Sequence, residues 1–324
     1  MAIALPDLTD RRLAIAELLE LRDDAEAFAE ASLAPETRRS YASATRAWDA
    51  WCKAHGVVSL PADPAGLALY VAELAKRLKA GSIAVHIAAI TYRQREHGFP
   101  RPLDRSPELA RILAGLRRTL GVAQRRVDAL VVDDARAICE QLDAEGSLAA
   151  KRDAAIVLVG IAGAFRRSEL CALVVDDLNF DGRGVEIAIR RSKTDQTGRG
   201  ATKIIPYTPN RLTCPVRALE SWLAAAAIVR GPVFRAVDRG RVSGSPLVGG
   251  SVARIVQRRV AAAGLEGDYS GHSMRAGFVT IADAAGVSET AIIRQTLHAS
   301  TAMLSRYRRT RTLWFDPPAA KLGL

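Results

Sequence analysis

Apolar residues along the first 120 positions recur every three or four residues, the spacing that places them on one face of an α-helix. The pattern predicts five helices: at about 10–31, 35–55 and 64–78, after Gly81-Ser82, and at about 106–120. No alternation of apolar and polar residues typical of strands appears before residue 122. We therefore predict an all-helical bundle for this part of the chain.

The second predicted helix carries a stripe of mostly aromatic residues at helical spacing: Tyr41, Ala44, Trp48 and Trp51. Such a stripe is typical of a packed core, so we interpret it as core rather than as a surface on which bases stack.

The rest of the chain mixes helical and strand-like patterns. Periodicity is lost at 121–127, which indicates a linker, and Asp133 or Asp134 then caps a helix. A strongly apolar helix is predicted at 151–163. Runs of β-like sequence separated by glycines predict a small antiparallel sheet, at 174–180, 184–190 and 201–206. Further helices are predicted at about 214–229, 250–263, 273–286 and 288–296, with a flexible loop at 239–250. The predicted fold is mainly α with a small antiparallel β-sheet.

Charge is unevenly distributed within a formal net charge of +11. Residues 1–36 contain three arginines against nine acidic residues, whereas residues 37–127 contain 16 lysines and arginines against six acidic residues. Basic surfaces bind polyanions, so the second segment is predicted to contact nucleic acid and the acidic leader is not.

Cysteine and hydropathy patterns narrow the class of protein further. The four cysteines are widely spaced and form no CxxC pair, which favours reduced thiols over a metal knuckle or disulfide framework. No apolar run approaches the length of a membrane span, and the N-terminus lacks a signal-peptide pattern. We predict a protein of the cytoplasm, or of the nucleoid if it is bacterial or encoded by a phage or plasmid, and expect no metal and no cofactor.

Six side chains together could act on a phosphodiester without a metal. Guanidinium groups bind phosphate oxygens bidentately, imidazole and ammonium groups move protons, and a phenol can be the nucleophile. The set comprises Arg166, Lys193, His272, Arg275, His298 and Tyr307. Each residue alone is more often a surface or packing residue, so the prediction rests on their order and spacing.

Local spacing supports a shared site. His272 and Arg275 lie three residues apart at a predicted helix start, where the helix N-terminus also attracts phosphate. Glu169 follows Arg166 by three residues and could orient it. Tyr307 follows His298 by nine positions. This interval would place the two side chains on opposite faces of one unbroken helix, so a helix break is predicted between them.

These residues resemble the motifs of the tyrosine recombinase (phage integrase) family. The strings RRSEL at 166–170 and SGHSMR at 270–275, with the nine-residue interval before the tyrosine, are similar to the family's motif boxes. Segments 47–53 and 98–102 resemble the N-terminal domain of Cre-like members. The similarity covers roughly residues 10–312.

The resemblance implies a site-specific DNA recombinase that clamps DNA between two domains and works as a tetramer through a Holliday junction. It implies that Tyr307 forms a 3′-phosphotyrosyl bond, that Arg166 and Arg275 hold the phosphate, and that Lys193 protonates the leaving 5′-oxygen. His272 and His298 would stabilise the phosphate or move protons, and Glu169 would support the site. The implied partners are double-stranded DNA carrying inverted repeats and further copies of the chain, a dimer on one site and a tetramer in synapsis.

The implied domains are an acidic segment with the first helix (1–33), a helical core DNA-binding domain (34–121), a linker (122–130), a catalytic domain (131–312) and a tail (313–324). Candidate DNA contacts in the basic segment are Arg38, Arg39, Arg46, Lys79, Arg117, Arg118, Arg125 and Arg126.

Two features depart from the family pattern, and two other functions compete. Arg167 stands where an apolar residue is usual, but only Arg166 has Glu169 at the three-residue interval. His298 stands where Cre-like members have tryptophan, although many members have histidine. The competing functions are DNA relaxation of the type IB topoisomerase kind and a non-catalytic architectural DNA-binding protein. The N-terminal resemblance disfavours the first, and the complete motif set disfavours the second.

Overall fold

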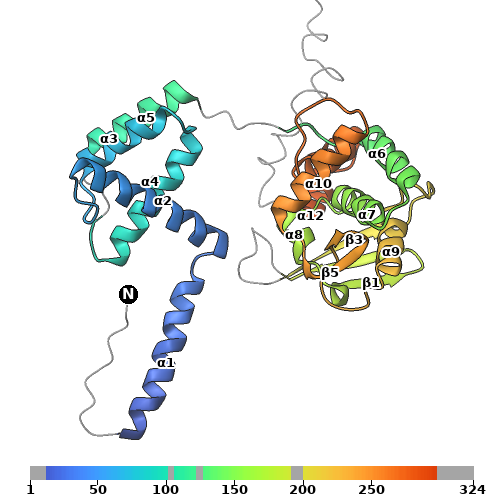
Figure 1. Cartoon of the computed structure of the whole chain (residues 1–324), viewed down its shortest axis with the longest axis horizontal. Helices are drawn as coiled ribbons and strands as arrows, with labels where there is room; N and C mark the ends of the chain where they lie inside the picture. The colour runs from blue at the N-terminus through green and yellow to red at the C-terminus, as the bar shows by residue number, and fades with distance from the viewer. Residues whose placement is uncertain (1–11, 101–105, 122–126, 191–199, 298–324) are drawn as a thin grey trace, which may run out of the picture. The chain divides into compact units, whose positions relative to one another are not determined.

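The computed structural model describes residues 12–100, 106–121, 127–190 and 200–297. The chain divides into two compact units, Met1–Gln124 and Arg125–Leu324, each with its own hydrophobic core (Figure 1). The described residues confirm the predicted fold class, because they are mainly helical with a small antiparallel sheet.

The described part of the first unit consists of helices only, as predicted. They are α1 (Arg12–Ala31), α2 (Pro35–His55), α3 (Pro64–Ala75), α4 (Ala80–Glu96) and α5 (Pro107–Leu120). Proline in the first turn starts α2, α3 and α5, and Asp63 and Ser106 accept backbone N–H groups at the starts of α3 and α5.

Three residues of the α2 stripe lie in the core of this unit, as predicted: Ala44, Trp48 and Trp51 are buried, whereas Tyr41 is half-buried. Trp48 is fully buried and stacks on Trp51, with ring centroids 5.5 Å apart. Tyr70 from α3 meets the edge of Trp48 at 5.1 Å. Aromatic rings bury large apolar areas, so this cluster joins α2 to α3.

The second unit is built around α7 (Leu148–Ala162), whose residues are mostly buried. Helices α6 (Val132–Glu145), α9 (Pro215–Ala225) and α11 (Ser273–Ala284) contact it. The sheet has the order β1-β2-β3 and is antiparallel throughout. Its strands are β1 (Leu178–Asp181), β2 (Gly184–Ile189) and β3 (Ala201–Pro206). The remaining helices are α8 (Arg167–Ala172), α10 (Gly249–Ala262) and α12 (Glu289–Thr296).

Three local predictions for this unit were wrong. The strand predicted at 174–180 begins only at Leu178, because Val175–Asp177 form a 3-10 helix. The loop predicted at 239–250 contains part of a hairpin, β4 (Arg235–Asp238) with β5 (Arg241–Pro246), turned by Arg239 and Gly240 at positive φ. Helix α6 starts at Val132, so neither Asp133 nor Asp134 precedes it as the cap. Asp134 instead accepts the N–H of Val131 from inside the first turn, at 3.0 Å.

None of the helices among the described residues is long and apolar enough to cross a bilayer.

Candidate active site

Arg166 stands at the start of α8 and is held by Glu169. Its backbone N–H donates to Glu169 Oε2 at 3.0 Å, and its Nη1 donates to Oε1 at 2.6 Å. The Glu169 side chain is almost fully buried, so water does not compete for its oxygens. A charge-assisted contact of this kind limits the orientation of the guanidinium.

Arg275 reaches the same place from α11. The residue is 1% exposed, and it donates through Nη1 to the Ala164 carbonyl at 2.7 Å and through Nη2 to the Thr296 carbonyl. Helix α11 packs against α7, and Gly160 leaves room there for the Met274 side chain: a Cβ at position 160 would lie 2.4 Å from Met274 Sδ.

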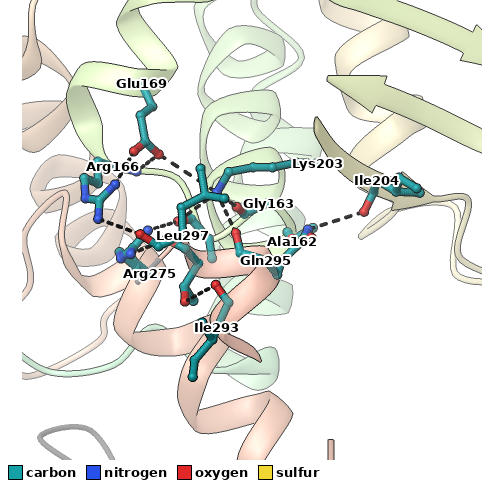
Figure 2. A network of polar contacts seen from close by, with 12 residues as sticks. Ala162, Gly163, Arg166, Glu169, Lys203, Ile204, Arg275, Ile293, Gln295 and Leu297 are labelled. Carbon is teal, nitrogen blue, oxygen red and sulfur yellow. Dashed lines mark hydrogen bonds and ion pairs between the residues drawn. The ribbon is translucent and has the colours of Figure 1, made fainter. Parts of the chain in front are cut away.

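Two left-handed residues shape the backbone around the arginines. Ala164 has φ 48° and Leu297 has φ 54°, a region that residues with a Cβ seldom adopt. Leu297 ends α12, and its carbonyl accepts a hydrogen bond from Arg166 Nη2 at 3.3 Å (Figure 2). Strained backbone persists where surrounding contacts hold it, and such residues cluster at functional sites.

His272 lies at the N-terminus of α11, one turn before Arg275, and only part of the residue is open to solvent. Desolvation of its ring, together with the charges of Arg275, Arg167 and Arg166, lowers its pKa below the ordinary value. The imidazole is therefore mainly neutral at neutral pH, a form in which it can both donate and accept a hydrogen bond.

Lys203 is a member of this cluster that the sequence prediction missed. It lies on β3, is fully buried, and donates from Nζ to the carbonyls of Gly163 at 2.5 Å and Gln295 at 2.7 Å. Its Nζ is 3.9 Å from Glu169 Oε2. Position 203 lies on the same inward face of β3 as Ala201 and Ile205, and this two-residue spacing was the available signal.

The structure gathers Arg166, Glu169 and Arg275 of the predicted set, with His272 at the start of the helix that carries Arg275. The predictions for Lys193, His298 and Tyr307 lie outside the described residues, as do those for Arg125 and Arg126. Six predicted DNA contacts of the first unit are exposed: Arg38, Arg39, Arg46, Lys79, Arg117 and Arg118.

Arg167 differs from Arg166 in its surroundings. It is exposed, and its side chain passes over Gly271, where a Cβ would lie 2.2 Å from Arg167 Cδ. Arg166, by contrast, is mostly shielded and paired with Glu169. The two neighbouring arginines therefore differ in burial and in charged partner.

Titration of Lys203 should be visible in the stability of the protein. Burial is the main reason why the pKa of Lys203 falls from 10.5 to about 7. The charge of Glu169 raises this pKa, and the charges of Arg275 and Arg166 lower it further. The unfolded chain therefore binds more protons than the folded chain between about pH 7 and pH 10. This group makes the free energy of unfolding rise with pH over that window, by at most about 1.4 kcal/mol per pH unit.

We expect urea unfolding of the wild type, relative to Lys203→Met, to show this gain between pH 7 and pH 9. Subtracting the variant removes the contributions of other titrating groups. A difference in unfolding free energy that does not change with pH would mean that Lys203 keeps an ordinary pKa in the fold.

The chain is similar to known proteins of one family. The model of the phage integrase family matches residues 128–312. An integrase/recombinase xerD homolog from Selenomonas ruminantium is 36% identical over 291 residues, which cover 89% of this chain and 85% of that protein. A lambda integrase dimer bound to a COC′ core site has a TM-score of 0.59 at 17% identity, covering 94% of this chain and 82% of that one.

A second solved structure, the Tn1549 transposon integrase in complex with transposon right-end DNA, also has a TM-score of 0.59, at 16% identity, covering 92% of this chain and 96% of that one. These two likenesses concern the fold. The match to the family model over more than half of the chain, together with the 36% identical relative, confirms the predicted resemblance: the chain belongs to the phage integrase family.

Proposed function

We propose that this chain is a site-specific DNA recombinase that cuts and rejoins strands by transesterification. The observation that carries the proposal is the convergence of Arg166 and Arg275 from two separate helix starts, beside the neutral imidazole of His272. Two guanidinium groups fixed by buried contacts form a preorganised site for the charge that develops on a phosphate in the transition state. The integrase/recombinase relative supports the same reaction class.

In the proposed reaction, the Tyr307 phenol oxygen attacks the phosphorus and the bond to the 5′-oxygen breaks. Lys193 gives a proton to that leaving oxygen, so a 3′-phosphotyrosyl ester and a free 5′-hydroxyl result. His272 or His298 accepts the proton that the phenol loses, the other imidazole hydrogen-bonds the phosphate, and Glu169 keeps Arg166 in place. Rejoining reverses the steps with a 5′-hydroxyl from another strand. One ester replaces another, so the reaction needs no nucleotide.

The proposed partners are double-stranded DNA with inverted repeats and other copies of the chain. The exposed arginines of α2 and α5 and the exposed Lys79 give residues 34–121 a surface for phosphates. Residues 131–312 would form the catalytic domain, joined by the linker at 122–130, with the acidic segment 1–33 and the tail 313–324 outside both. A dimer on one site and a tetramer joining two sites, with a Holliday junction between the two strand exchanges, complete the proposal. The proposed place of action is bacterial DNA in the cytoplasm.

Cleavage should proceed in excess EDTA, because Arg166, Arg275 and Lys193 supply the positive charge that a metal ion would bring to the phosphate. The measurement is covalent attachment of the protein to a nicked suicide substrate, run on a denaturing gel at fixed ionic strength. The matched control is the same reaction with Mg²⁺ in place of EDTA. A strict Mg²⁺ requirement for the covalent step would contradict the proposed chemistry.

A further inference from the structure

The C-terminal end of α12 is held by three cations. Three consecutive carbonyls accept hydrogen bonds there, that of Gln295 from Lys203, that of Thr296 from Arg275 and that of Leu297 from Arg166 (Figure 2). The three cations come from β3, from α11 and from the start of α8. The last carbonyls of a helix lack partners within the helix and carry partial negative charge, so they attract cations.

Lys203, like Arg275, is closed off from solvent, whereas Arg166 is partly exposed. Its Nζ donates to the backbone carbonyls of Gly163, Ala164 and Gln295, and lies 4.7 Å from the centre of the Phe165 ring. An ammonium placed in this way cannot reach DNA without breaking those contacts. Lys203 therefore contacts other parts of the protein and not DNA.

Those contacts join three parts of the fold. Gly163 ends α7 and leads to Arg166, Gln295 belongs to the last turn of α12, and Glu169 holds the Arg166 guanidinium. Lys203 thus lies between the turn that carries Arg166 and helix α12. Along the chain, α12 is followed by His298 and Tyr307.

The Gln295 side chain strengthens the same junction. Its Nε2 donates to the Ala162 carbonyl at 3.1 Å and to the Ile204 carbonyl at 3.3 Å. The main chain of Gln295 is therefore held by Lys203 while its side chain is held by the end of α7 and by the residue after Lys203 on β3.

A buried ammonium is a costly way to fill this space. Removing a charge from water costs several kcal/mol, and an apolar side chain of similar size is often equally stable or more so. Hydrogen bonds to fixed carbonyls, however, define direction and distance, which apolar packing does not.

We infer that Lys203 and Gln295 are positioning residues that fix the C-terminal end of α12 against the turn carrying Arg166. The inference rests on the proposed function. The chain that continues from Leu297 to the nucleophile then starts from a set position relative to the phosphate-binding arginines. Geometric errors near the reacting atoms cost far more in rate than in binding.

The test separates rate from binding with three single variants. Lys203→Met removes the ammonium, Gln295→Leu removes only the side-chain anchor, and Thr202→Met is the control, an exposed neighbour on the same strand. Single-turnover covalent attachment to a nicked suicide substrate is measured at saturating protein. Half-site affinity by gel shift and the melting temperature are measured alongside.

We expect Lys203→Met and Gln295→Leu to slow attachment by roughly ten- to a hundredfold. Half-site affinity and the rate of Thr202→Met should stay close to the wild-type values. Both residues hold one junction, so their effects should not multiply. The attachment rate of the double variant should be close to that of the slower single variant.

Gln295 is only half-buried, so its variant keeps the inference testable even if Lys203→Met fails to fold. Wild-type rates in Gln295→Leu, or rate losses matched by equal losses of half-site affinity, would overturn it. If the wild-type protein itself forms no covalent adduct, the proposed function fails and the inference fails with it. If the wild type forms the adduct and both variants react at the wild-type rate, only the positioning role is rejected.

Discussion

Tyr307→Phe should abolish covalent attachment to DNA while leaving binding almost unchanged. The substitution removes one hydroxyl group, which is the proposed nucleophile, and alters little of the positive surface that binds the DNA backbone. No other group in the proposed mechanism can form the phosphotyrosyl ester, so the expected loss of adduct is complete within detection. The measurement is a denaturing gel of a nicked suicide substrate, with a gel shift on an intact half-site for binding.

The chain offers a matched control for this experiment. Tyr269→Phe removes a phenol hydroxyl from a tyrosine of the same unit that packs against the hydrophobic core. That variant should keep its covalent attachment. An adduct that persists in Tyr307→Phe would show that another residue is the nucleophile.

The elements of the fold were predictable where the sequence pattern is local. The helix at 35–55 begins and ends where the pattern indicates, because a proline in the first turn and Gly56 in the left-handed conformation mark its limits. The hairpin of β4 and β5 was not predictable in this way. In this hairpin the paired residues Val237 and Val242 pack on the core. One apolar residue on each strand gives only a weak alternation of apolar and polar positions.

The site shows the same contrast between local and distant contacts. The pairing of Arg166 with Glu169 lies within one helical turn, and sequence spacing alone indicated it. The contacts of Lys203 join residues about 40 and 92 positions away, to Gly163 and Gln295. No motif within β3 indicates that partnership, because it depends on how the sheet packs against α7 and α12.

Arg166→Lys should slow covalent attachment far more than Arg167→Lys does. A lysine at position 166 cannot reproduce the planar pair of N–H donors that binds two phosphate oxygens, nor the simultaneous contacts to Glu169 and the Leu297 carbonyl. Loss of one such transition-state contact costs on the order of 3 kcal/mol, or about a hundredfold in rate.

Arg167 provides the comparison because it is adjacent, carries the same charge and is exposed over Gly271. Its lysine variant keeps the positive charge near His272, so the expected loss of rate is small. The measurement is single-turnover attachment at saturating protein for both variants, with half-site affinity as the check on binding. Equal losses of rate in the two variants would mean that both arginines contact the phosphate. A larger loss in Arg167→Lys would place the essential guanidinium at position 167. Glu169 would then support the fold of α8 rather than the chemistry.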